Sequence, residues 1–312
     1  MLTLPQISLA APVSELAAGI ESARDGVLLL TDVPAAPLPY MRQIFDELKE
    51  SQHIGNRLNK AYTKNLVYKD SHAAGEGGVE VDMKRVLDLS PERLAQIKAT
   101  EPTLAEMPSD ELHLTLAFWD RCAAEVMPKL LKAMSTAVGC DVESDAHCNY
   151  RMVDYYERPE NVAAPRCGEH RDFGTATLVF ASQPGLEFSL NDTWRPIPPV
   201  PEGSALLLFG WCTQIRSNGR IPAALHRVVD APAVGGIVPR RTSAVLFIAP
   251  KDVETPLEPV VREGEARQYI SGVKVGQLRG KVTHSRPQSH AHFSLNTKPS
   301  TQAKISDWNI IC

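Results

Sequence analysis

A histidine–aspartate pair and a distant histidine have the residue types and the spacing of a metal site. His170 and Asp172 form an H-x-D pair, and His226 follows Asp172 by 54 positions. Two imidazoles and one carboxylate can cover one face of Fe(II) and leave the opposite positions open for a co-substrate and O2. The chain holds nine histidines, so such a pair can also arise by chance. The interpretation therefore depends on the sequence around it.

The two segments that carry these residues are typical of strands. Residues i and i+2 of a strand point to the same side, so His170 and Asp172 can reach one ion if their segment is extended. The run 175–180 that follows is rich in β-branched and aromatic residues, and 224–229 around His226 is a second strand-like run. The sequence therefore favours a metal site built on strands.

The second half of the chain alternates short β-rich runs with turn residues. We expect six strands, which lie at 150–156, 176–180, 186–190, 205–209, 225–229 and 242–248. This spacing is typical of a double-sheet jelly roll or a barrel. The predicted fold class is mainly β with α cover, a double-stranded β-helix core with a helical N-terminal region.

The first half has mixed patterns that predict this cover. The run 27–31 predicts a buried strand, and the apolar spacing of 39–53 predicts a helix. The range 109–138 is the longest helical pattern, in which Pro128 should kink or divide the helix and Gly139 should end it.

We expect a single domain over 1–312. Its parts are a mixed, mostly helical cover (1–148), a jelly-roll catalytic core (149–255) and a C-terminal lid or tail (256–312).

Composition excludes several classes of function. The net charge of −4 gives no reason to expect a nucleic acid or an anionic membrane as partner. We find neither a secretory leader nor a run of about 20 apolar residues that would span a bilayer. The six cysteines are scattered without a C-x-x-C pair, which favours free thiols in a reducing compartment. A cytoplasmic protein acting on a small molecule is expected, and the oligomeric state stays open.

A second pair of residues predicts an anion clamp. Arg241 and Ser243 stand two apart at the start of the last core strand, so they share one face. A guanidinium fork and a hydroxyl suit a carboxylate. Such a pair at the inner end of the pocket could hold a dicarboxylate whose other end chelates the iron.

Together these features resemble one known family. The chain is similar to the isopenicillin N synthase-like branch of the Fe(II)/2-oxoglutarate oxygenases, and most like deacetoxycephalosporin C synthase-type enzymes. The resemblance covers roughly residues 5–250. The residues that carry it are Asp25–Thr31, Asp82–Lys84, His170-x-Asp172, Gly185–Glu187, Trp194, Pro201–Leu207, Ser217–Arg220, His226–Val228 and Arg241-x-Ser243.

The resemblance implies a function for each predicted site residue. His170, Asp172 and His226 would bind Fe(II), while Arg241 and Ser243 would hold the far carboxylate of 2-oxoglutarate, with Tyr155 as a further co-substrate contact. It implies that 2-oxoglutarate and O2 yield succinate, CO2 and a ferryl oxidant that abstracts hydrogen from a small specialised-metabolism substrate. Hydroxylation, desaturation, cyclisation and ring expansion all remain open as outcomes.

Five residues near the predicted site are candidates for the substrate pocket, namely Arg151, Asp154, Phe180, Trp211 and Phe247. Asp154 could equally make a structural hydrogen bond. Where the family often has G-D-x-L-Q, this chain has Gly210-Trp211-Cys212-Thr213-Gln214. Trp211 therefore either shapes an unusual pocket or fills the core.

Other polar residues are more easily explained without chemistry. The cluster of His284, His290 and His292 lacks a carboxylate, and we interpret it as part of a solvated tail. Arg171 and Arg220 could steer an acidic substrate, but surface ion pairs are the simpler expectation.

Two rival functions remain open. Isopenicillin N synthase and aminocyclopropane-carboxylate oxidase share the R-x-S pair but do not use 2-oxoglutarate, so the pair does not prove the co-substrate. A catalytically silent jelly roll that binds a small ligand is the other alternative. The complete ligand set argues against it.

Overall fold

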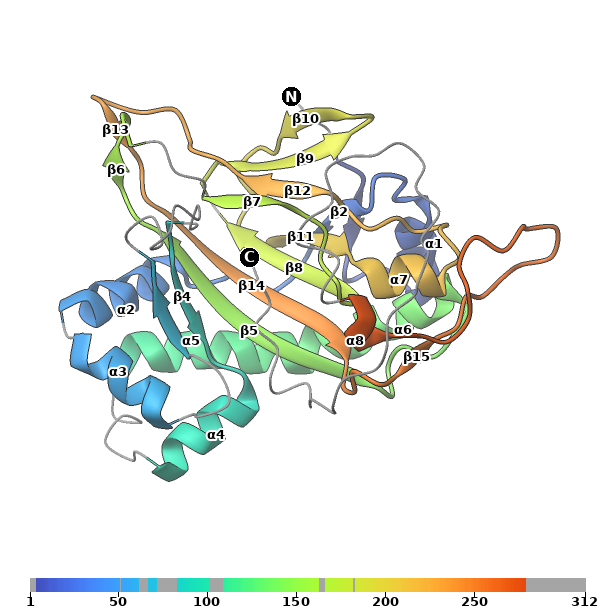
Figure 1. Ribbon diagram of the computed structural model, residues 1–312, viewed down its shortest axis with the longest axis horizontal. Coiled ribbons are helices and arrows are strands. Elements are labelled where there is room, and N and C mark those ends of the chain that lie inside the picture. Colours follow the sequence, from blue (N-terminus) through green and yellow to red (C-terminus); the bar gives the residue numbers. More distant parts are fainter. Residues whose placement is uncertain are drawn as a thin grey trace.

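The fold is described from a computed structural model. The structure describes residues 4–50, 52–61, 67–71, 83–100, 109–162, 166–181 and 183–278. Within this part of the chain, the predicted strands and helices can be compared with the observed ones (Figure 1).

An eight-stranded sheet forms the centre of the molecule. Its strands are antiparallel apart from the parallel pair of β1 and β2. Their order is β1 (Gln6–Ser8), β2 (Val27–Thr31), β11 (Ser204–Phe209), β8 (Ala176–Ala181), β14 (Arg241–Pro250), β5 (Ala146–Tyr155), β4 (Arg85–Asp88) and β3 (Tyr68–Asp70).

A smaller sheet faces one side of the larger one. Its order is β10 (Thr193–Pro196), β9 (Leu186–Leu190), β12 (His226–Val228) and β7 (Cys167–His170). The two facing sheets are the predicted double-stranded β-helix core, and the described strands do not close into a barrel. Two further strand pairs lie outside the sheets, β6 (Arg158–Pro159) with β13 (Ile237–Val238) and β15 (Pro256–Leu257) with β16 (Val273–Lys274).

Helices cover the other side of the larger sheet, as Figure 1 shows for α2 to α5. The helices are α1 (Val13–Ser22), α2 (Leu38–Glu50), α3 (Gln52–Ala61), α4 (Pro91–Thr100), α5 (Ser109–Arg121), a π-helical turn (Cys122–Val126), α6 (Met127–Val138), α7 (Trp211–Arg216) and α8 (Val275–Leu278). No helix in the described part of the chain is long and apolar enough to cross a bilayer.

The alternation of side chains along each strand separates two apolar cores. Tyr150 and Met152 of β5 pack with the helices, in the same core as Leu178 and Phe180 of β8. Residues of opposite parity, such as Val153, Tyr155 and Val179, pack between the sheets with Leu186, Phe188 and Val228. A residue's position in the alternation therefore decides whether it can reach a pocket between the sheets.

This alternation corrects two predictions about the substrate pocket. Phe180 lies on the helix side, where its ring packs edge-on against Phe118 with centroids 5.1 Å apart. Asp154 faces the same side, is fully buried and binds Arg240 Nε at 2.7 Å and Arg85 Nη1 at 3.4 Å. Neither side chain lies between the sheets, so neither lines the pocket. The alternative of a structural role for Asp154 is the one observed.

The long helical pattern at 109–138 is present, but it is divided. Five residues, Cys122–Val126, form a π-helical turn between α5 and α6. Pro128 then sits in the first turn of α6, where its missing amide breaks no hydrogen bond of that helix. Gly139 ends α6 with a φ of 90°, a left-handed conformation that glycine adopts without steric cost.

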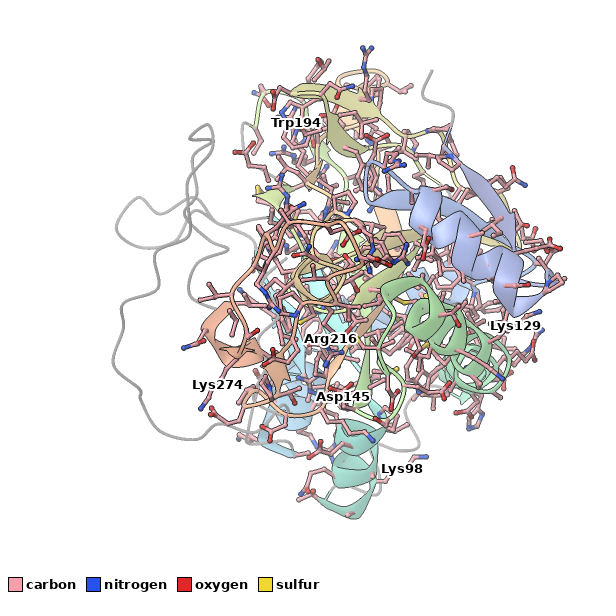
Figure 2. All side chains as sticks on the ribbon, turned by 90° about the vertical axis from the view of Figure 1, so that its right-hand side faces the viewer. Lys98, Lys129, Asp145, Trp194, Arg216 and Lys274 are labelled. Carbon is pink, nitrogen blue, oxygen red and sulfur yellow. The ribbon has the colours of Figure 1, made fainter. Side chains whose placement is uncertain are left out.

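The segments beside the core meet the other expectations in part. The helix predicted at 39–53 ends at Glu50, and α3 begins at Gln52. The helix α7 is fastened to the start of β5 by an ion pair of 3.0 Å between Arg216 and Asp145 (Figure 2). From the predicted lid, Leu257, Val273, Val275 and Leu278 pack against Phe247 and Cys212 at the end of the larger sheet. The rest of that tail, with its histidine cluster, lies outside the described residues.

Loss of the Asp154 carboxylate should destabilise the protein strongly. Asp154→Ala leaves the guanidinium of Arg85 buried without this carboxylate, and removing one partner of a buried ion pair costs about 3–5 kcal/mol. Urea unfolding followed by circular dichroism measures the free energy of unfolding. Glu125→Ala is the control, because it breaks the exposed pair with Arg121 and should leave the midpoint unchanged. Equal midpoints for both variants would contradict this account.

Candidate metal centre and pocket

The structure brings the three predicted metal ligands together. His170 ends β7 and His226 begins β12, and the two are direct cross-strand partners. Asp172 lies just beyond the end of β7 rather than inside a strand. One ligand atom from each residue lies within 4.8 Å of the other two. This is the geometry that three ligands of one ion require.

Backbone carbonyls orient both imidazole rings. Nδ1 of His170 lies 2.8 Å from the Gly168 oxygen, and Nδ1 of His226 lies 3.0 Å from the Ala224 oxygen. A carbonyl can only accept, so Nδ1 carries the proton in each ring. The lone pair of each Nε2 is then directed toward Asp172, whose Oδ1 lies at 3.6 Å and 3.9 Å. Such outer contacts fix the tautomer that a metal needs.

A hydrogen bond from the larger sheet orients the carboxylate of Asp172. Thr177 on β8 donates a hydrogen bond of 2.5 Å to Oδ2 of Asp172, and both side chains are buried. Oδ1 is thereby turned toward the two histidines. The larger sheet thus positions Asp172, which lies just after β7 of the smaller sheet.

Burial favours the metal-binding form of His226. Desolvation and then the neighbouring His170 lower the pKa of His226 to about 4. The imidazole is therefore neutral at pH 7 and able to coordinate. Two imidazoles and one carboxylate match the ligands of non-haem Fe(II).

The predicted anion clamp lies in the same pocket. Arg241 and Ser243 of β14 line it together with Tyr155 of β5, which is the direct cross-strand partner of Arg241. Arg241 is buried, donates to Ser243 Oγ at 3.3 Å and lies 5.4 Å from the Tyr155 ring centroid. Its Nε has no hydrogen-bond partner among the described residues. A buried guanidinium with an unused donor fits a carboxylate ligand.

Burial also acts on the charge of Arg241. It lowers the pKa of the guanidinium, because desolvation disfavours the charged form. A bound carboxylate would offset that cost by restoring a counter-charge.

Three predicted substrate residues remain on the pocket side of the fold. Arg151 and Phe247 line the pocket, with the guanidinium carbon of Arg151 5.5 Å from the Phe247 ring centroid. Trp211 begins α7 at the edge of the C-terminal core, and the Arg171 guanidinium carbon lies 5.9 Å from its ring centroid. Arg171 also donates to the Ala223 oxygen, whereas Arg220 forms the expected ion pair with Glu265 at 3.0 Å.

Several residues of the site were not predicted from the sequence. Asp88 holds Arg151 by two hydrogen bonds, Thr177 holds Asp172, and Lys84 donates to the pocket-lining Cys167 at 3.5 Å. The alternation along 149–155 could have assigned faces within β5. No sequence pattern says which residues of β4 or β8 lie opposite.

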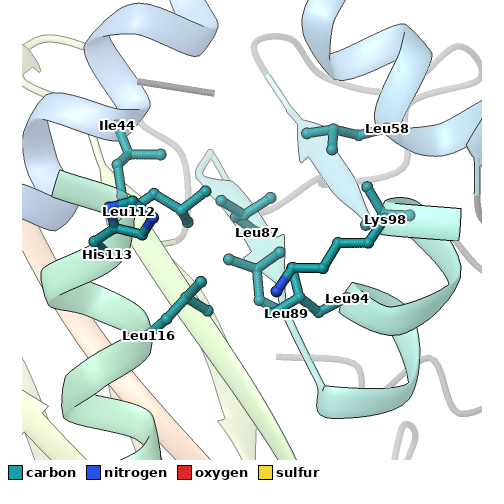
Figure 3. A pocket seen from close by; sticks show the side chains of 10 residues that line it. Ile44, Leu58, Leu87, Leu89, Leu94, Lys98, Leu112, His113 and Leu116 are labelled. Carbon is teal, nitrogen blue, oxygen red and sulfur yellow. The ribbon is translucent and has the colours of Figure 1, made fainter. Parts of the chain in front are cut away.

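A second cavity lies on the helix side of the larger sheet, where α2 to α5 meet β4 (Figure 3). Its wall consists mainly of leucines, and the side chains of Lys98 and His113 bring nitrogen atoms to it. The described residues that line it include no carboxylate and none of the metal-ligand candidates. The chemistry therefore belongs to the pocket between the sheets.

Comparison with known proteins shows which family the pocket region resembles. Residues 145–250, which contain all three candidate ligands and the arginine–serine pair, match the model of the 2OG-Fe(II) oxygenase superfamily. This region of the chain is therefore similar to the 2OG-Fe(II) oxygenases. The comparisons do not confirm the narrower resemblance to deacetoxycephalosporin C synthase-type enzymes.

Named relatives in this superfamily are distant. A 2-oxoglutarate-dependent dioxygenase of Aspergillus rugulosus is 27% identical over 119 residues, which are 36% of this chain and 34% of that protein. A feruloyl CoA ortho-hydroxylase of Ipomoea batatas is 30% identical over 181 residues, which are 54% of this chain and 49% of that protein. The matched region thus spans about a third to a half of these relatives.

Solved structures share the fold across most of the chain. A full-length Neurospora crassa protein in complex with alpha-KG and 5-formyluracil has a TM-score of 0.64 at 18% identity, covering 89% of this chain and 94% of that one. A 2OG-Fe(II) oxygenase family protein of Caulobacter crescentus has a TM-score of 0.66 at 20% identity, covering 89% and 98%. The shared fold therefore extends well beyond residues 145–250.

Removing the hydroxyl that holds Asp172 should weaken metal binding without abolishing it. We expect Thr177→Val to reduce Fe(II) affinity about 10- to 100-fold, as is usual when the outer partner of a ligand is lost. Asp172→Ala should nearly abolish binding, because it removes the charged ligand. Anaerobic Fe(II) titration measures both. The exposed Thr193→Val is the matched control, and an affinity equal to this control for Thr177→Val would refute the positioning role.

Proposed function

We propose that the protein is an Fe(II)- and 2-oxoglutarate-dependent oxygenase that oxidises a small molecule. One observation carries the proposal: a candidate iron triad and a buried arginine–serine clamp line the same pocket between two sheets. A five-carbon dicarboxylate that chelates a metal at one end needs such an arrangement.

The residues at the two ends of the pocket would bind different groups. At one end, the Nε2 atoms of His170 and His226 and an oxygen of Asp172 would hold the metal. At the other, Arg241 and Ser243 would bind the far carboxylate of 2-oxoglutarate through charge-assisted hydrogen bonds. Tyr155, beneath the guanidinium, keeps that side chain in place by a cation–π contact.

Bound iron would supply the redox chemistry, with 2-oxoglutarate and O2 converted to succinate and CO2 while the substrate loses a hydrogen atom. The protein's own contribution is orientation and the exclusion of water. His170, Asp172, His226 and Arg241 are each less than one-fifth exposed. This burial shields the reacting centre from solvent.

The substrate and the place of the reaction also belong to the proposal. Relatives named after feruloyl CoA hydroxylation support a small substrate from specialised metabolism. We further propose a cytoplasmic location. The five cysteines in the described part of the chain are all free thiols, which is usual in a reducing compartment.

An anaerobic titration tests the co-substrate directly. Adding 2-oxoglutarate to the Fe(II)-loaded protein should produce a weak visible metal-to-ligand charge-transfer band, because the keto acid chelates the metal. Protein that binds iron but shows no band would instead favour an oxidase of the isopenicillin N synthase type, in which the arginine holds the substrate's own carboxylate. Protein that binds no iron would favour a silent ligand-binding jelly roll.

Removing the clamp should separate metal binding from co-substrate binding. We expect Arg241→Leu to retain iron and to need at least about tenfold more 2-oxoglutarate for half-maximal band intensity, since the buried charge opposite the far carboxylate is gone. Arg227→Leu, on the smaller sheet with its guanidinium carbon 4.1 Å from the Trp194 ring centroid, is the control. An unchanged requirement in Arg241→Leu would show that the co-substrate assignment is wrong.

A further inference from the structure

One wall of the pocket carries polar groups that the metal and co-substrate do not use. Asn149 and Arg151 of β5 share the face of Val153 and Tyr155, because residues two apart in a strand point to the same side. Both are more than nine-tenths buried. Arg151 lines the pocket directly, and Asn149 is the cross-strand partner of the pocket-lining Phe247.

The register places this wall away from the path of the co-substrate. Strand β14, which carries Arg241, lies between β8 and β5. Thr177 of β8 holds the metal-ligand candidate Asp172. Arg151 of β5 is separated from Val179 of β8 by the intervening β14, a distance of about 10 Å at usual strand spacing. A molecule stretched from Arg241 to the metal extends toward β8. The space beside Arg151 is therefore left for the substrate that is to be oxidised.

Neighbouring charges fix the orientation of both side chains. Asp88 of β4 accepts hydrogen bonds from Arg151 Nε and Nη2 at 2.7 and 2.8 Å. Arg93 of α4 donates to Asn149 Oδ1 at 2.7 Å and lies 3.6 Å from Asp88. Because the amide oxygen faces Arg93, the amide nitrogen must face the other way.

That amide nitrogen is a buried donor without a partner. Nδ2 of Asn149 makes no hydrogen bond among the described residues, and leaving a buried donor unpaired is unfavourable. Within the same part of the chain, two guanidinium groups, those of Arg151 and Arg93, share the carboxylate of Asp88. An unused amide donor beside a buried guanidinium favours an anionic acceptor.

We propose that Asn149 and Arg151 bind a carboxylate of the substrate, which is therefore a small organic acid. Its apolar part would lie against Phe247, whose ring borders the Arg151 guanidinium. The inference rests on the proposed function and specifies its substrate class. Arg151 and Asn149 set specificity in this scheme, while Asp88 and Arg93 position them.

Matched acids and amides test this directly. The Fe(II)-loaded protein with saturating 2-oxoglutarate is titrated anaerobically with phenylacetate, 4-phenylbutyrate and octanoate, and then with the corresponding primary amides. Perturbation of the charge-transfer band reports binding next to the metal. We expect at least one acid to bind tenfold or more tightly than its amide.

Two variants remove the recognition and keep an oxygen at position 149 for Arg93. Asn149→Asp keeps an oxygen for Arg93 but replaces the free donor by a negative oxygen. Arg151→Gln combined with Asp88→Asn removes the ion pair as a whole. Each should cost the acid at least tenfold in affinity and leave the amide nearly unchanged, whereas Arg121→Gln on the exposed face of α5 should change neither.

Failure of the proposed function and failure of the carboxylate site give different results. Without a charge-transfer band, the proposed function itself is wrong. With the band present, equal binding of acids and amides, no binding of any acid, or a preference that survives in both variants would overturn the carboxylate site.

Discussion

The pairing of β14 with β5 on one side and β8 on the other is the constraint on which the site depends. It sets Arg241 against Tyr155, Ser243 against Ala181 and Phe247 against Thr177. Because side chains alternate along a strand, a slip of one residue would turn Arg241 and Ser243 from the pocket to the helices. The apolar cores on both faces oppose that slip, since each accepts only one parity of β14. The packing of the whole sheet thus maintains the anion clamp.

The same sheet separates two kinds of buried charge. On the helix side, Asp154 lies between Arg85 and Arg240, so that acid and base are matched within the protein. On the pocket side, Arg241 has a hydroxyl and an aromatic ring as its contacts, with a donor that no described residue uses. Buried charges are tolerated when they are paired. Arg241 therefore differs from Arg85 and Arg240, because it relies on a ligand for complete pairing.

Much of the site could be predicted because it follows the period of a strand. Arg241 and Ser243 are two apart within β14, and His170 and Asp172 have the same spacing although Asp172 lies just beyond the end of β7. Short patterns of this kind are visible in one sequence. The same rule could have excluded Asp154, which has the opposite parity to Tyr155 in the same strand. Phe180 fails for a related reason, since its neighbour Val179 is the residue that faces the pocket. The alternation separates the two faces of a strand but does not say which face lines the pocket. The predictions of Asp154 and Phe180 therefore combined residues from opposite faces.

The supporting residues could not be predicted in this way, because they lie on other elements than the residues that they hold. Thr177 meets Asp172 only because β7 and β8 belong to facing sheets, and Asp88 meets Arg151 only because β4 pairs with β5 in one register. These contacts fix the directions in which the ligands and the arginine point. A motif therefore specifies which atoms can bind, whereas the packing of strands against one another determines where they are held. The unpaired amide nitrogen of Asn149 also results from packing. The position of Arg93 on α4 decides which end of that amide faces away from the helix.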